Sequence, residues 1–104
     1  MNHGLSHKTV QKIKGVLAKY EQVDSAILYG SRATGNYRNG SDIDLALKGS
    51  DCNLKLLAKI CNEIDDLLLP YKLDISIYKN IDNKDLIEHI NNIGVDFYQK
   101  PPTL

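Results

Sequence analysis

Hydrophobic residues recur along this chain with two different spacings, and these spacings predict helices and strands in turn. Apolar residues three to four positions apart form the stripe of an amphipathic helix, whereas alternate apolar residues form one face of a strand. The segments follow the order helix, strand, loop, strand, helix, strand, helix, with room for a short final strand. This order predicts an α/β (α+β) fold, a small mixed β-sheet of three to four strands flanked by helices.

The most regular helical stripe is predicted between Asp51 and Pro70. Asp51 is a residue type that caps helices, and Pro70 ends the helix because proline lacks the N–H that a helix interior needs. Cys52 and Cys61 both lie within this predicted helix, ~13 Å apart along its axis, which is too far for a disulfide. The stripe consists of Leu56, Leu57, Ile60, Cys61, Ile64, Leu67 and Leu68.

Two further helices are predicted, one near each end of the chain. The first is capped by Ser6 and runs to about Tyr20, with its stripe on Val10, Ile13, Leu17 and Tyr20. The last opens at Asp82 or Asn83, and Gly94 stands where a C′ glycine ends a helix. Its stripe consists of Leu86, Ile87, Ile90 and Ile93.

Alternating residues predict the strands, and two of these strands carry acidic residues on one face. The predicted strands are 23–29, 42–47, 73–78 and, more briefly, 95–98. Because successive side chains of a strand point to opposite faces, Asp42 and Asp44 share one face of the second strand. Asp74 lies on the equivalent face of the third strand. If these strands are neighbours, the three carboxylates converge.

A cluster of carboxylates needs a physical reason, because like charges a few ångströms apart repel. A divalent cation supplies one: Mg²⁺ favours one or two carboxylates together with phosphate oxygens, and two such ions can clamp both oxygens of a displacement at phosphorus. The alternative is that Asp42 is a turn residue and that Asp44 and Asp74 simply face water. His3, His7 and His89 share no ligand spacing and are interpreted as surface or helix-face residues.

The loop before the second strand is a candidate phosphate site. Gly30 ends the first strand, and a glycine there lets the backbone approach a phosphate closely. The Ser31 hydroxyl adds a donor, and Arg32 or Arg38 offers a charged fork. No Gly-Lys-Ser/Thr follows, so the segment is not a P-loop.

Length and composition indicate a single domain and argue against nucleic-acid and membrane partners. The 104 residues leave room for a single domain, 1–104, with a frayed end expected around Pro101 and Pro102. Thirteen basic and thirteen acidic residues balance, so no direct nucleic-acid partner is expected. No apolar run approaches the ~20 residues that span a bilayer, so no membrane partner is expected. The cysteines are expected to be free thiols of a cytoplasmic protein.

The motifs together resemble a known family. Gly30-Ser31, ten residues, Asp42-Ile43-Asp44 and a third Asp on a later strand resemble the signature of the DNA polymerase β-like nucleotidyltransferase superfamily. Within it, GSRATG and SDIDLAL in a short chain resemble the minimal nucleotidyltransferases, the MNT or MntA-like antitoxins. The similarity covers nearly the whole chain and implies the nucleotidyltransferase fold.

The resemblance also implies residue roles. Asp42 and Asp44 would bind two Mg²⁺ ions, and Asp74 would bind the catalytic metal and help to deprotonate the attacking hydroxyl. The triphosphate of ATP would lie on Gly30 and Ser31. Further nucleotide-binding candidates are Arg32, Arg38 and Ser41. Members of the group often carry a second Arg where this chain has Thr34, so the triphosphate contacts stay open, with the two arginines as substitutes.

The function implied by the resemblance is Mg-dependent transfer of AMP from ATP to a tyrosine of a HEPN-family ribonuclease toxin encoded beside the gene. Larger enzymes of the superfamily carry an extra helical domain that 104 residues do not accommodate, so a partner protein and a hetero-oligomer are expected. Two alternatives are a catalytically silent antitoxin that acts by binding only, and nucleotidyl transfer to a small molecule such as an aminoglycoside.

Overall fold

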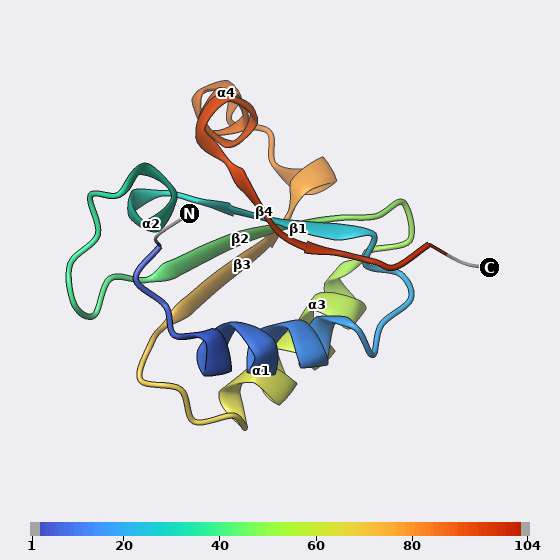
Figure 1. Cartoon of the computed structure of the whole chain (residues 1–104). Coiled ribbons are helices and arrows are strands. Elements are labelled where there is room, and N and C mark those ends of the chain that lie inside the picture. Colours follow the sequence, from blue (N-terminus) through green and yellow to red (C-terminus); the bar gives the residue numbers. More distant parts are fainter. Residues whose placement is uncertain (1–2, 103–104) are drawn as a thin grey trace.

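The computed structural model describes residues 3–102, which form one four-stranded sheet with helices on both faces (Figure 1). The strand order is β3-β2-β1-β4. β1 pairs antiparallel with β2 and β4, whereas β2 and β3 are parallel, so the predicted mixed sheet is confirmed. The strands are β1 (Ser25–Tyr29), β2 (Ile43–Lys48), β3 (Leu73–Ile77) and β4 (Val95–Gln99).

The helices cover the two faces of the sheet unequally. α1 and α3 pack side by side on one face, and α4 lies alone on the opposite face (Figure 1). A short helix, α2, directly follows β1, and a 3-10 turn, η1, follows β3. The bounds are α1 (His7–Leu17), α2 (Ser31–Thr34), α3 (Leu54–Asp65), η1 (Tyr78–Asn80) and α4 (Lys84–Ile93).

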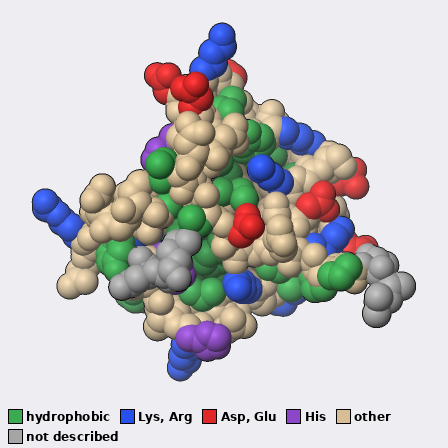
Figure 2. Space-filling model, turned by 45° about the horizontal axis from the view of Figure 1, so that its top comes forward, with side chains coloured by type: hydrophobic (Ala, Val, Ile, Leu, Met, Phe, Trp, Pro, Cys, Tyr) green, Lys and Arg blue, Asp and Glu red, His purple; other side chains and the backbone are tan. Residues whose placement is uncertain are grey.

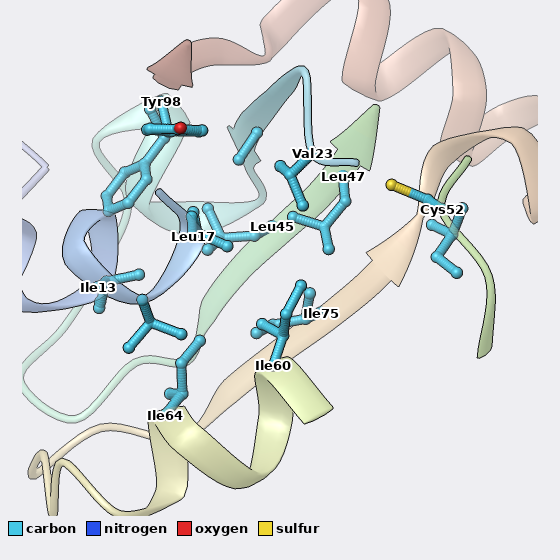
Figure 3. Close-up of a cluster of buried hydrophobic side chains, with 14 of the residues drawn as sticks. Ile13, Leu17, Val23, Leu45, Leu47, Cys52, Ile60, Ile64, Ile75 and Tyr98 are labelled. Atoms are coloured by element: carbon cyan, nitrogen blue, oxygen red, sulfur yellow. The ribbon is translucent and has the colours of Figure 1, made fainter. Parts of the chain in front are cut away.

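Strand parity sorts the side chains between two hydrophobic clusters. The larger cluster fills the space between the sheet and helices α1 and α3 (Figure 3). It contains Ile43, Leu45 and Leu47 from alternate positions of β2. Ala46, from the other face of β2, joins a small cluster with Ile90 of α4. The acidic positions of β2 therefore lie on the sparsely covered face, as their parity predicts.

The predicted bounds of α3 are wrong at both ends. The side chain of Asn53, not Asp51, accepts the Leu56 N–H and caps the helix, so Cys52 precedes the helix. The helix ends at Asp65, well before Pro70, and Leu68 has φ 54° and is 88% exposed. The turn is already made at Leu68, so proline does not end the helix. Both cysteines are free, as predicted.

Gly94 follows α4 as predicted, but not in the left-handed conformation of a C′ glycine. Its φ is −58° and ψ 147°, which any residue adopts. A Cβ at this position would collide with the Ile90 carbonyl and with Ile27, so the constraint is close packing of α4 on β1. Of the two N-cap candidates, the structure uses Asn83, whose side chain accepts the Leu86 N–H.

Other predicted boundaries shift by one to three residues; β2 runs from Ile43 to Lys48 rather than over 42–47, and β4 extends to Gln99 rather than to residue 98. β1 begins at Ser25 rather than residue 23, α1 ends at Leu17, and Tyr78 belongs to η1 rather than to β3. The predicted frayed end falls partly on residues 103–104, which lie outside the described residues. No helix in residues 3–102 is long and apolar enough to cross a membrane. Lys and Arg side chains are dispersed among acidic ones on the face in Figure 2, without a continuous basic patch.

Truncation of Ile60 tests the larger cluster. Ile60 of α3 is fully buried, and we expect Ile60→Ala to lower the free energy of unfolding by ~2–5 kcal/mol because it leaves a cavity. Urea denaturation measures the loss. Leu54→Ala, on the same helix but 72% exposed, is the control and should change stability by less than ~0.5 kcal/mol. Equal losses in the two variants would contradict this packing.

Candidate functional site

The two strand carboxylates stand directly opposite each other. Parallel pairing of β2 with β3 places Asp44 in register with Asp74, on the face that α4 covers only in part. Asp42 immediately precedes β2, two residues before Asp44 and therefore on the same parity. The sequence-based expectation that the strands are neighbours is confirmed, and the three acidic residues lie at the N-terminal ends of β2 and β3.

The electrostatics of this cluster follow from its position. The pKa of Asp44 is raised, first by partial burial and then by the negative charges of Asp74 and Asp42. Ionised Asp44 is therefore disfavoured by its surroundings unless a positive charge is bound nearby. Oxygen donors of this kind suit a hard divalent cation such as Mg²⁺.

The three carboxylates suit a metal ion by their chemistry, but they do not form a complete coordination shell. Among residues 3–102, no group of three or more His, Cys, Asp or Glu side chains has the geometry of a metal site. Asp42 and Asp74 are exposed and Asp44 is half-buried, so the three carboxylates form an open set that solvent can reach. Magnesium, which keeps several waters and phosphate oxygens as ligands, tolerates such an open set.

The Gly-Ser turn contacts the carboxylates directly. Gly30 caps α2 with φ 77° and ψ −156°, a conformation that favours glycine, and a Cβ built there would collide with Oδ2 of Asp44. Glycine is thus required twice over, by its backbone conformation and by the close approach of the carboxylate. Ser31 opens α2 next to it. The two halves of the predicted site, loop and carboxylates, are brought together.

Arg32 does not lie where a phosphate ligand would. Only 2% of the residue is exposed, and its Nε and Nη2 donate to the Ser41 carbonyl at 3.1 and 2.9 Å, while Nη1 donates to the His3 carbonyl at 3.0 Å. The guanidinium also lies over the rings of Tyr37 and Tyr71, 5.2 and 4.9 Å from their centroids. The structure therefore favours a role for Arg32 in holding the loop, and its predicted contact with nucleotide is not supported by its position.

The other loop candidates are placed differently. The Ser41 hydroxyl accepts the Arg38 N–H at 2.8 Å, so Ser41 shapes the turn before β2. The side chain of Arg38 is exposed on the loop, where it can reach a bound anion. Thr34 is exposed and its hydroxyl donates to the Ser31 carbonyl at 3.2 Å, at the end of α2.

His89 is the site residue that sequence reasoning missed. It lies on α4, and its Nε2 accepts the Gly30 N–H at 3.0 Å. Its ring meets Tyr29 edge-on, and burial raises the pKa of Tyr29, whose hydroxyl pairs with Ser76 on β3. Interpretation as a helix-face histidine is right for its helix but misses this contact. No local sequence pattern predicts the contact between His89 and Gly30, because the two residues are 59 positions apart.

Comparison with known families agrees with this geometry. The sequence model described as "Polymerase beta, Nucleotidyltransferase" matches residues 11–103. The chain belongs to this nucleotidyltransferase family. No functionally curated protein matches the sequence significantly.

Solved structures show the same fold as this nucleotidyltransferase. A chain of a toxin–antitoxin crystallised with AMP-PNP superposes with TM-score 0.71 at 18% identity, over 88% of this chain and 73% of that chain. A chain from the complex of a tri-AMPylated Shewanella oneidensis HEPN toxin with MNT antitoxin gives 0.68 at 15%, over 92% and 74%. A chain of the MntA–HepT toxin–antitoxin gives 0.67 at 15%, over 91% and 74%. At these identities the likeness establishes the fold.

Substitution of the two loop arginines tests whether Arg32 stabilises the fold or binds phosphate. We expect Arg32→Ala to destabilise the protein by at least ~2 kcal/mol, because the buried guanidinium and its hydrogen bonds to the part-buried Ser41 and His3 carbonyls are lost. Arg38→Ala, from the same loop but exposed, should change stability by less than ~0.5 kcal/mol. Urea denaturation compares them. Unchanged stability of Arg32→Ala with weakened ATP binding would instead make Arg32 a phosphate ligand.

The raised pKa of Asp44 predicts that its charge destabilises the fold. A carboxyl whose folded-state pKa lies above its unfolded value stabilises the protein below the unfolded pKa and loses that contribution as pH rises through the folded pKa. Asp44→Asn removes the loss, so with a chelator present at pH 7 it should be more stable than wild type, by less than ~1 kcal/mol because solvent screens the group.

The gain should vanish below pH ~3.9, where the aspartate is neutral in both states. Thermal unfolding across pH 3–8 measures it. Asp96→Asn, at an exposed position of the edge strand β4, is the matched control and should change stability at pH 7 by less than ~0.5 kcal/mol. A destabilised Asp44→Asn at pH 7 would mean that the carboxylate makes stabilising contacts that outweigh its repulsion.

Proposed function

We propose that this nucleotidyltransferase transfers AMP from ATP to a tyrosine of a HEPN-family toxin and so acts as the antitoxin of a toxin–antitoxin pair. The observation that carries the proposal is the register of Asp44 with Asp74, with Gly30 packed against the Asp44 carboxylate. This arrangement sets an acidic cluster beside a turn that suits phosphate, as transfer at phosphorus requires.

The structural neighbours support the choice of nucleotide and partner. One is a toxin–antitoxin with AMP-PNP, an ATP analogue, and another contains a tri-AMPylated HEPN toxin with MNT antitoxin. The open face beside α4 leaves room for a partner to supply the acceptor, so the working unit is proposed to be a hetero-oligomer. The free thiols of Cys52 and Cys61 suit the reducing cytoplasm, where ATP is also available.

The residues of the chain divide the chemistry among them. Ser31 holds the phosphates through its backbone N–H and its hydroxyl, and Gly30, whose own N–H is engaged by His89, lets the backbone approach them closely. Arg38 adds charge from the loop. The tyrosine oxygen of the toxin attacks the α-phosphorus, a new P–O bond forms, and the bond to the bridging oxygen breaks as pyrophosphate leaves. Asp74 takes the proton of the attacking hydroxyl.

Asp42, Asp44 and Asp74 are the residues that would hold magnesium. When bound, Mg²⁺ supplies Lewis-acid stabilisation of phosphate charge and offsets the repulsion among the three carboxylates. Asp44, half-buried and electrostatically coupled to both Asp74 and Asp42, would be one of the residues that hold the metal. Loss of its charge would therefore weaken metal binding.

Intact mass spectrometry tests the proposal. Wild-type protein, Mg-ATP and the HEPN toxin encoded beside it are mixed, and the toxin should gain mass in increments of one AMP unit. Asp44→Asn and Asp74→Asn should slow the transfer by about 10²–10⁴-fold, because an ionised ligand or proton acceptor is lost. Asp65→Asn should transfer at the wild-type rate.

The same experiment distinguishes the rival functions. Neutralisation of the toxin with no mass gain in any sample would leave a binding-only antitoxin. Mass gain with Asp44→Asn equal to wild type would place the active site elsewhere. Transfer to a small aminoglycoside acceptor, with the toxin unmodified, would favour the small-molecule alternative.

A further inference from the structure

One hydrogen bond joins helix α4 to Gly30, at the start of the loop between β1 and β2. The Gly30 N–H donates to Nε2 of His89 at 3.0 Å. An accepting Nε2 means a neutral ring with its proton on Nδ1. The edge-on contact with Tyr29, with centroids 6.1 Å apart and planes at 79°, limits rotation of the ring. His89 is thus an oriented acceptor rather than a solvated helix-surface residue.

The conformation of Gly30 is only weakly restricted by the residue itself. It has no side chain, and glycine has more backbone freedom than any other residue. Yet its conformation, φ 77° and ψ −156°, decides how close the turn comes to Oδ2 of Asp44 and where the N–H of Ser31 points. A contact from outside the loop is needed to keep one conformation, and His89 makes such a contact at the Gly30 N–H.

The packing of α4 on the sheet fixes the position from which His89 makes this hydrogen bond. Within α4, Ile90 is the buried residue, packed with Tyr29 and Ala46 on the sheet. His89 is its neighbour in sequence, so the packed Ile90 fixes the helix next to the loop and sets the reach of the imidazole. The packing of α4 on the sheet therefore helps to fix the position of the Gly30 backbone beside the carboxylates.

We infer that His89 is a positioning residue of this site. By accepting the Gly30 N–H, it holds the Gly-Ser turn against Asp44 in the conformation that binds the nucleotide. The inference rests on the proposed function for its rate readout. His89 acts through Gly30 and not by contact with the reacting atoms.

Three variants test the inference. His89→Ala removes the acceptor, and His89→Gln keeps one, since its side-chain oxygen has a similar reach. Asn92→Ala is the control, an exposed position on the same helix. Thermal unfolding first establishes that all three fold.

The first readout is the ¹H–¹⁵N resonance of the Gly30 amide in the protein without nucleotide. Loss of the acceptor should move the amide proton upfield in His89→Ala, whereas His89→Gln and Asn92→Ala should stay near the wild-type position. An unmoved resonance in His89→Ala would overturn the inference at its first step.

The second readout is binding and turnover. Affinity for Mg–AMP-PNP, by calorimetry, and the rate constant for AMP transfer should fall about 10–100-fold in His89→Ala, the scale of losing a supporting contact behind a site. His89→Gln should recover most of the loss. Equal affinity and rate in His89→Ala and Asn92→Ala would overturn the positioning role and leave a purely structural contact.

The readouts separate failure of the inference from failure of the proposed function. If wild type modifies no toxin yet binds Mg–AMP-PNP, the proposed function fails, and the Gly30 resonance with the AMP-PNP affinities still decides the role of His89. If wild type binds no Mg–AMP-PNP, both fail.

Discussion

Parallel pairing of β2 with β3 is the constraint on which the site depends, because it keeps Asp44 and Asp74 side by side against their repulsion. Neither charge stabilises this arrangement. The stabilisation comes from the other face of the same strands, where alternate apolar residues are buried under α1 and α3. Strand parity therefore couples the two faces: each residue that secures the core also fixes the direction of an adjacent carboxylate. The cost of gathering the acids is offset by a core that they never touch.

The loop between β1 and β2 is held at its two ends by different parts of the molecule. His89 of α4 meets Gly30 at the beginning, and Arg32 meets the Ser41 carbonyl at the end. Arg32 also joins the His3 carbonyl, so the segment before α1 takes part in the same structure. The backbone at both ends of the loop that precedes the acidic pair is thus fixed, although most of the loop itself is exposed.

Sequence patterns predicted the parts of the site that depend on local order. Parity alone placed Asp42, Asp44 and Asp74 on one face, and the resemblance joined Gly30 to them. The roles of Arg32 and His89 depend instead on contacts between distant segments: Tyr71 lies 39 positions beyond Arg32 (71 − 32), and His89 lies 59 beyond Gly30. Neither a periodicity nor a motif encodes such pairs. The end of α3 was misjudged for a related reason, since Leu67 and Leu68 continue the apolar stripe although the backbone has already turned.

The two arginines of the loop show why residue type alone is a poor guide to phosphate contacts. A guanidinium suits phosphate, but it equally suits backbone carbonyls and aromatic faces when it is buried. Arg32 donates to two carbonyls, and moving it to a phosphate would leave those part-buried acceptors without their partners, which costs free energy. Arg38 pays no such cost, because its side chain is exposed and its backbone N–H alone is engaged, on Ser41. The buried first arginine therefore stabilises the conformation of the loop, and the exposed second one is the arginine that the proposed function leaves available for a nucleotide.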